Sequence, residues 1–373
     1  MLDTRQRVAP QPANEPVPKK IMVIDDDVIF RQVTRQFLHA IGYQVVEAEN
    51  GLEGLQLLES SEPDLVLCDI AMPILDGIEF VEEVSQQYPS MPVIVVSATD
   101  EMSDVAKALR FGIKDFLPKP IGNYKHLSDA VETVLKESDS SIADGKDFSS
   151  QWFRVDGGGE LPEEQELHWH LEYLQQNPAA ARDLLHALLP DKDTSQGSWH
   201  CSYRLLQSTE AMPLVFDYAW LMNGQFVFYI IDSGNSEYSD EVHPEAGSSV
   251  ATTMLVRALF HDYLRHLKNF SADMKDLLGV IERGIDCSEG GPVPALFGLA
   301  DLPSGTIDIL PAGLDCQWTS GDFHQSINHG ENLGEHSLKN FITRELPIKN
   351  SGRLTLSITG STSFSFDIQQ TKS

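Results

Sequence analysis

The sequence contains few cysteines, few positive charges and no long apolar run. Its four cysteines form no CxxC pair, which excludes a zinc ribbon and a disulfide framework and favours small buried thiols in a reducing compartment. Lys and Arg number 27 against 56 Asp and Glu, and no basic cluster interrupts this excess. The chain therefore lacks the electrostatic footprint of a nucleic-acid-binding protein. The cysteines are Cys68, Cys201, Cys287 and Cys316.

The sequence also lacks a targeting segment and a membrane span. Residues 1–20 are polar and contain four prolines instead of the apolar core of a signal peptide. No stretch of about 18 consecutive apolar residues occurs in the chain. These absences predict a cytoplasmic protein with no membrane partner.

The apolar content is sufficient for two domains. With 373 residues, 41 % of them hydrophobic, the chain can bury two separate cores. We expect a flexible Pro-rich arm over 1–19, a first domain over 20–136, a flexible Ser- and Gly-rich connector over 137–160, a helical linker over 161–190 and an effector domain over 191–373.

The first domain alternates five short apolar runs with amphipathic segments. This alternation is typical of a parallel sheet covered by helices on both faces, and it predicts an α/β fold with the strand order of the flavodoxin and CheY folds. The expected strands are Ile21–Ile24, Tyr43–Glu47, Leu65–Cys68, Val93–Val96 and Asp115–Leu117.

The linker is expected to be a helical hairpin or a broken helix. Leu167, Leu171 and Leu174 recur on one helical face, and Asn177 before Pro178 is a plausible cap for a second helix that runs to Leu189. His168 and His170 lie two residues apart and so point to different sides of a helix, which disfavours a metal site; we expect both to face solvent. The effector domain combines strand-like runs with a helical run over about 248–268, which predicts an α+β fold.

Polar residues follow the expected strands of the first domain at the edge where ligands bind in such sheets. Asp25 and Asp26 follow the first strand, Asp69 the third, Ser97 the fourth and Lys119 the fifth. Singly, such residues are often helix caps or solvated ends. Together they provide what phosphoryl transfer to a carboxylate needs: a nucleophile in Asp69, acidic ligands for Mg²⁺ in all three aspartates, and donors to phosphoryl oxygens in Ser97 and Lys119.

These residues lie in strings that resemble the receiver domains of two-component response regulators, over about residues 20–136. The resemblance implies that Ala71 offers a backbone carbonyl to the metal and that Ser97 and Phe116 are a switch pair that rearranges on phosphorylation. It also implies a phosphodonor, either a kinase in a phosphorelay or acetyl phosphate. The strings are IMVIDDD, LVLCDIAMPILDG, VIVVSAT and FLPKP.

The effector domain resembles the PP2C-type phosphatases of anti-sigma regulation, but with metal ligands replaced. Leu214 stands where the GGD element has its aspartate, Thr359 stands at the TDG position, and Asp232 alone keeps a ligand of the GDVSG element. One aspartate cannot hold a two-metal site. The resemblance therefore implies a pseudophosphatase domain without a cofactor, which acts by binding.

The whole layout is similar to the RssB-type adaptors, including the strings SATDEMSDVAKALR, NPAAARDLL and MLVRALF. That family implies delivery of the stationary-phase sigma factor sigma-S to the ClpXP protease through ClpX, with antagonism by anti-adaptor proteins. Two alternatives stay open. One is an active phosphatase in which carboxylates such as Asp217 and Asp315 rebuild a metal site, and the other is a partner-switching scaffold that sequesters its partner.

Overall fold

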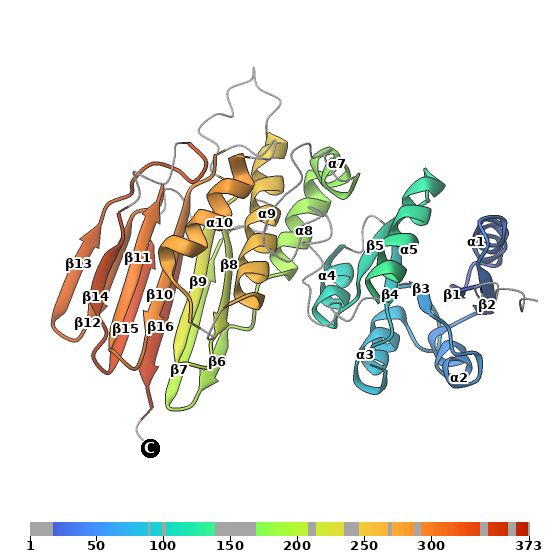
Figure 1. Ribbon diagram of the computed structural model, residues 1–373, viewed down its shortest axis with the longest axis horizontal. Helices are drawn as coiled ribbons and strands as arrows, with labels where there is room; N and C mark the ends of the chain where they lie inside the picture. The colour runs from blue at the N-terminus through green and yellow to red at the C-terminus, as the bar shows by residue number, and fades with distance from the viewer. Residues whose placement is uncertain are drawn as a thin grey trace, which may run out of the picture.

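The computed structural model describes ten stretches of the chain, in which a receiver-like α/β unit and a β-rich unit are joined by two helices (Figure 1). The predicted arm over 1–19 and connector over 137–160 lie almost wholly outside these residues, as do Leu167, His168, Cys287 and Thr359. The described residues are 18–88, 90–98, 102–138, 169–207, 214–234, 246–267, 271–286, 292–335, 342–356 and 363–371.

A five-stranded parallel sheet forms the centre of the first unit. Its strand order, β2-β1-β3-β4-β5, is the order that the alternating pattern predicts, so the expected fold class is confirmed. The strand β5 lies at one edge of the sheet and β1 and β3 are central neighbours. The strands are β1 Lys20–Ile24, β2 Gln44–Ala48, β3 Leu65–Asp69, β4 Val93–Ala98 and β5 Asp115–Lys119.

Five helices cover the two faces of this sheet. Odd and even residues of each strand point to opposite faces, so the sheet fills one core with α1 and α5 and another with α2, α3 and α4. The helices are α1 Val28–Ala40, α2 Gly51–Ser61, α3 Gly77–Gln87, α4 Met102–Arg110 and α5 Tyr124–Ser138.

Two short helices connect the units, α7 Trp169–Gln176 and α8 Pro178–Ala187. Leu171 and Leu174 are buried, as their helical spacing predicts. Asn177 does precede the second helix, but its side chain makes no cap and instead donates to the carbonyl oxygen of Tyr173 at 2.8 Å. The expected side-chain cap is therefore wrong, because the broken helix offers the Asn177 amide an open carbonyl of the preceding turn.

The second unit is built on two antiparallel sheets. One has the order β14-β11-β10-β9-β8 and the other the order β13-β12-β15-β16-β7-β6. The strands are β6 Asp193–Gln196, β7 Trp199–Leu206, β8 Leu214–Trp220, β9 Gln225–Asp232, β10 Ala295–Asp301, β11 Thr306–Ala312, β12 Cys316–Ser320, β13 Phe323–Ile327, β14 Arg344–Pro347, β15 Ser351–Leu356 and β16 Ser363–Gln370.

The two sheets pack face to face, and two helices, α9 Ala246–Arg265 and α10 Met274–Asp286, cover the outer face of the first (Figure 1). Strand β9 explains this layering. Phe226 and Phe228 point into the core between the sheets, whereas Val227 and Tyr229 alternate with them and pack under the helices. This confirms an α+β arrangement in which β9 is buried on both faces.

One hydrophobic core runs from the receiver-like unit through the linker helices into the second unit. Helix α8 packs on α4, and α7 packs on α9, so the linker touches both units (Figure 1). Arg110 at the end of α4 also pairs with Asp191, beyond α8, at 2.8 Å. Within the described part of the chain, no helix is long and apolar enough to span a bilayer.

Candidate phosphoacceptor site

Three aspartates meet at the carboxyl edge of the parallel sheet. Asp69 ends β3 and Asp25 directly follows the neighbouring strand β1, so the backbone places both side chains at one point. Ligand atoms of Asp25, Asp26 and Asp69 lie within 4.8 Å of one another. No other group of His, Cys, Asp or Glu side chains in the described residues has such spacing. Asp25 and Asp69 are buried and Asp26 is exposed, so the cluster opens to solvent on one side.

Lys119, the last residue of β5, supplies the positive charge of the pocket. Its Nζ atom lies 2.8 Å from Oδ2 of Asp25 and 2.7 Å from Oδ2 of Asp69. The same ammonium stands 4.8 Å from the ring centroid of Phe30 on α1. The Lys119–Pro120 peptide bond is cis. The ammonium therefore bridges two carboxylates that would otherwise repel each other.

Burial perturbs the protonation of all three charged groups. It raises the pKa of Asp69 to about 6, although Lys119 acts in the opposite direction. It also raises the pKa of Asp25, again against the effect of Lys119. Burial alone would lower the pKa of Lys119, but its contacts with both carboxylates raise it. Burial consequently disfavours the charged carboxylates, and a cation beside the pair offsets this cost.

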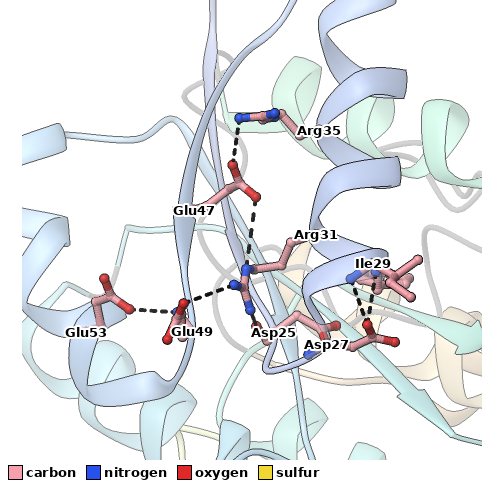
Figure 2. A network of polar contacts seen from close by, with 9 residues as sticks. Asp25, Asp27, Ile29, Arg31, Arg35, Glu47, Glu49 and Glu53 are labelled. Atoms are coloured by element: carbon pink, nitrogen blue, oxygen red, sulfur yellow. Dashed lines mark hydrogen bonds and ion pairs between the residues drawn. The ribbon is translucent and has the colours of Figure 1, made fainter.

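The third aspartate of the DDD string and a buried arginine hold the first loop in place (Figure 2). Oδ1 of Asp27 accepts from the backbone N–H of Ile29 at 2.8 Å and caps α1. Arg31 on α1 donates from Nη1 to the carbonyl oxygen of Asp25 at 2.6 Å and pairs through Nη2 with Glu49 at 3.2 Å. The loop that carries Asp25 is thus tied to both α1 and the chain after β2.

The remaining predicted residues lie around this cluster. Ser97, near the end of β4, and Phe116, on β5, are both buried on neighbouring strands. Ala71 lies two residues after Asp69 on an exposed part of the loop after β3. The structure brings the acidic residues and Lys119 into contact, and it places Ser97 one residue beyond Val96, the partner of Asp69 on β4.

Gly77, the first residue of α3, allows this loop to close over the phosphoacceptor position. A Cβ atom there would lie 2.0 Å from the carbonyl oxygen of Asp69 and 2.7 Å from Cα of Ile70. Both contacts are to backbone, which cannot rotate away. Only glycine fits, so the helix start and Asp69 have a fixed spacing.

The donor set suits a hard divalent cation. Carboxylate oxygens are the ligands that Mg²⁺ prefers, and one exposed and two buried carboxylates leave room for water. Asp25, Asp26 and Asp69 would hold the ion, with the Ala71 carbonyl as the expected fourth protein ligand. The ion would supply charge neutralisation at phosphoryl oxygens.

Comparisons with known proteins agree with this geometry. Residues 21–132 match the model of the response regulator receiver domain. Over 325 residues the chain is 29 % identical to the Regulator of RpoS, RssB, of Escherichia coli strain K12, which covers 85 % of this chain and 88 % of that protein. The chain is therefore similar over most of its length to an RssB-type response regulator, and its first unit matches the receiver domain.

Other relatives match the receiver part alone. The response regulator MprA of Mycobacterium sp. strain KMS is 38 % identical over 104 residues, which are 28 % of this chain and 45 % of that protein. Among solved structures, a CheY-like receiver domain protein of Methanospirillum hungatei is 29 % identical with a TM-score of 0.32 and covers 33 % of this chain and 98 % of that chain.

In the second unit, two of the positions compared with phosphatase ligands lie side by side. Leu214 on β8 and Asp232 on β9 are direct partners in the antiparallel register. Leu214 is 2 % exposed, and an apolar side chain there offers no ligand atom. Asp232 accepts from the backbone N–H of Gly234 at 3.1 Å.

The carboxylates that could rebuild a metal site are engaged elsewhere. Asp217 on β8 is buried and paired with Arg257 and, at 2.9 Å, with His261 of α9. Burial alone would raise the pKa of Asp217, but these two partners lower it. Asp315 accepts from the backbone and the ring of His329, mainly the backbone N–H at 2.6 Å, which lowers its pKa. Neither carboxylate lies in an acidic cluster among the described residues.

Sequence reasoning misplaced one residue and missed two. His170 does not face solvent: it is 0 % exposed, because α7 lies against β5 and buries that side of the helix. Arg31 reads as an ordinary polar residue of an amphipathic helix, and only the fold reveals its contact with Asp25. Gly77 belongs to the ILDG string. Its position directly after Asp76, which caps α3, could have indicated a tight helix start.

Proposed function

We propose that this RssB-type regulator is a cytoplasmic adaptor that delivers sigma-S to the ClpXP protease. Phosphorylation of Asp69, by a kinase or by acetyl phosphate, increases its affinity for sigma-S. The receiver, the linker helices and the effector domain together form the recognition surface, ClpX docks on the complex, and anti-adaptor proteins oppose it. The relative that is named Regulator of RpoS, the sigma-S factor, extends over most of the chain and supports this proposal.

The observation that carries the proposal is the pocket of Asp25, Asp26, Asp69 and Lys119. An Asp69 carboxylate oxygen attacks the phosphorus of the donor, the bond from phosphorus to the donor nitrogen or oxygen breaks, and the donor leaves with that electron pair. Lys119, 2.7 Å from Asp69, and Ser97 then donate to the new phosphoryl oxygens. The acyl phosphate carries close to two negative charges where the carboxylate carried one, and this change at a buried point biases the surrounding loops.

The effector domain acts by binding and not by hydrolysis. Leu214, beside Asp232, replaces one of the ligands that a two-metal site requires. Asp217 forms an ion pair with Arg257 inside the domain. The acidic chain, with its net charge of −29, suits a partner with basic surfaces, as DNA-binding sigma factors have.

A reconstituted degradation assay tests the proposal. Purified sigma-S, ClpXP and ATP are mixed with wild-type protein or with Asp69→Asn, each with and without an acyl-phosphate mimic such as beryllofluoride. We expect wild-type protein to accelerate loss of sigma-S, and the mimic to increase the rate for wild type alone. Unchanged sigma-S levels would overturn the adaptor role.

Two outcomes would favour the alternatives. Binding of sigma-S without degradation indicates a sequestering scaffold. Manganese-dependent turnover of p-nitrophenyl phosphate that is lost in Asp232→Ala indicates an active phosphatase. Asp322→Ala is the matched control, because this exposed carboxylate lies in the turn between β12 and β13 and is not one of the candidate ligands.

A further inference from the structure

A buried histidine of the linker contacts the receiver at its expected switch residue. His170, on α7, is fully buried. Its Nε2 atom lies 2.9 Å from the carbonyl oxygen of Phe116 and 2.8 Å from Oδ1 of Asp115. Both oxygens accept hydrogen bonds, so the shared Nε2 must carry the hydrogen. A single N–H group of the linker therefore serves two acceptors on β5.

These acceptors lie on the open edge of the receiver sheet. Strand β5 is last in the order β2-β1-β3-β4-β5, so among the described residues no strand pairs with its outer side. At Phe116 the outward N–H donates to Oδ1 of Asp115 at 2.8 Å, and the carbonyl accepts from His170. The imidazole also meets the Phe116 ring edge-on, with centroids 5.0 Å apart. The linker thus supplies a hydrogen-bond donor to the strand edge at Phe116.

The same short strand reaches the phosphoacceptor pocket. Lys119 ends β5 three residues after Phe116, and its ammonium contacts Asp69 at 2.7 Å. A phosphoryl group on Asp69 moves the best position for this ammonium outward, because the new oxygens lie beyond the carboxylate. A displacement of β5 by about 1 Å lengthens both contacts of His170 past hydrogen-bonding range. Loss of these contacts removes the hydrogen bond that ties α7 to the Phe116 carbonyl of the receiver.

We propose that His170 is a positioning residue that couples the linker helix α7 to the phosphoacceptor site. With Asp69 unmodified, its Nε2–H closes the edge of β5 at Phe116 and holds α7 on the receiver. Phosphorylation of Asp69 weakens this contact and releases α7 from β5, while Leu171 and Leu174 keep it in the core shared with α9. This inference rests on the proposed role of Asp69. Because coupling is reciprocal, loss of the His170 contact favours phosphorylation.

Hydrogen exchange of full-length protein over residues 169–187 tests the coupling. In wild type, beryllofluoride with Mg²⁺ is expected to increase exchange in this segment about 5-fold or more, within the usual range of coupling between sites. His170→Phe removes the donor, so its exchange is already raised without the mimic and changes less than about two-fold on its addition. His170→Gln places an amide N–H near the Nε2 position and keeps the wild-type response.

Two further variants separate coupling from general destabilisation. His170→Asn has an amide too short to reach Phe116 and is expected to behave as His170→Phe does, which provides a second loss variant if the phenylalanine protein folds poorly. His186→Phe is the matched control on α8, since His186 contacts Gln207 and not β5. It is expected to respond to the mimic as wild type does.

Phosphorylation itself provides the second readout. With acetyl phosphate as donor and phosphate-affinity gels as assay, His170→Phe is expected to reach at least about 5-fold more phosphoprotein relative to unmodified protein than wild type. A merely structural role would lower stability without this gain. If Asp69 is phosphorylated normally and the linker shows the same exchange response in wild type and His170→Phe, the role of His170 is overturned. The proposed function would then still stand. Absence of phosphorylation in every variant would overturn the proposed function as well.

Discussion

Replacing Asp69 with asparagine is expected to stabilise the fold, although it removes the proposed phosphoacceptor. Burial raises the pKa of Asp69 to about 6 against an ordinary value of 3.8, which means that the folded protein disfavours the charged carboxylate. The difference of about two pH units corresponds to about 3 kcal/mol. Solvent reaches the pocket beside the exposed Asp26, and screening reduces the figure. We therefore expect Asp69→Asn to raise the free energy of unfolding by about 1–2 kcal/mol at pH 8.

The pH dependence of this gain has a definite sign. Above pH 6 the wild-type carboxyl is charged in both the folded and the unfolded chain, so the full penalty falls on the folded state. As the pH falls from 6 toward 3.8, the folded protein takes up its proton before the unfolded chain does, and the penalty shrinks. The advantage of Asp69→Asn is consequently present above pH 6 and lost below about pH 4.

Urea unfolding in EDTA at pH 8 and pH 4 measures the effect. The matched control is Asp129→Asn, an exposed carboxylate of α5, which should change stability by less than about 0.5 kcal/mol. Added Mg²⁺ should stabilise wild type more than Asp69→Asn, because the cation relieves the same repulsion. A loss of stability in Asp69→Asn at pH 8, or a gain that persists at pH 4, would show that burial does not disfavour the charged Asp69 carboxylate.

Three other substitutions test separate parts of the structure by the same unfolding assay. Lys119→Met leaves two buried carboxylates without their counter-charge and should cost about 2–4 kcal/mol at pH 8 and less at pH 5, where the carboxyls gain protons; a pH-independent loss would contradict this. Gly77→Ala forces a Cβ atom against the carbonyl of Asp69 and should cost about 3 kcal/mol and slow phosphorylation, whereas normal phosphorylation would show that the loop relaxes freely. Arg257→Met leaves Asp217 buried with His261 and should cost about 3 kcal/mol, so a stable variant would argue against an internal cation.

The first unit could be predicted from its sequence because its signals are local. Five apolar runs fix the strands, and residues that follow parallel strands meet at one edge whatever the loops do. Asp25, Asp69 and Lys119 therefore came together as expected, within 2.8 Å. The functional roles of these residues and the domain boundaries stay predictions.

The linker contact could not be predicted in the same way. The spacing of histidines along α7 says which helical side each one occupies, but not which strand that side meets. His170 is buried because α7 lies against β5, a contact between residues 54 positions apart. The ion pair between Asp217 and Arg257, 40 positions apart, has the same origin. Such partners depend on how whole layers pack, which periodicity does not encode.

The affinity for sigma-S in the two states of Asp69 tests whether phosphorylation controls the adaptor. Titration of purified sigma-S against wild-type protein and Asp69→Asn, each with and without beryllofluoride and Mg²⁺, gives four dissociation constants. We expect the mimic to lower the dissociation constant of wild type by about 10-fold and to leave that of Asp69→Asn unchanged. Equal affinities for wild type with and without the mimic would contradict a phosphorylation-controlled adaptor.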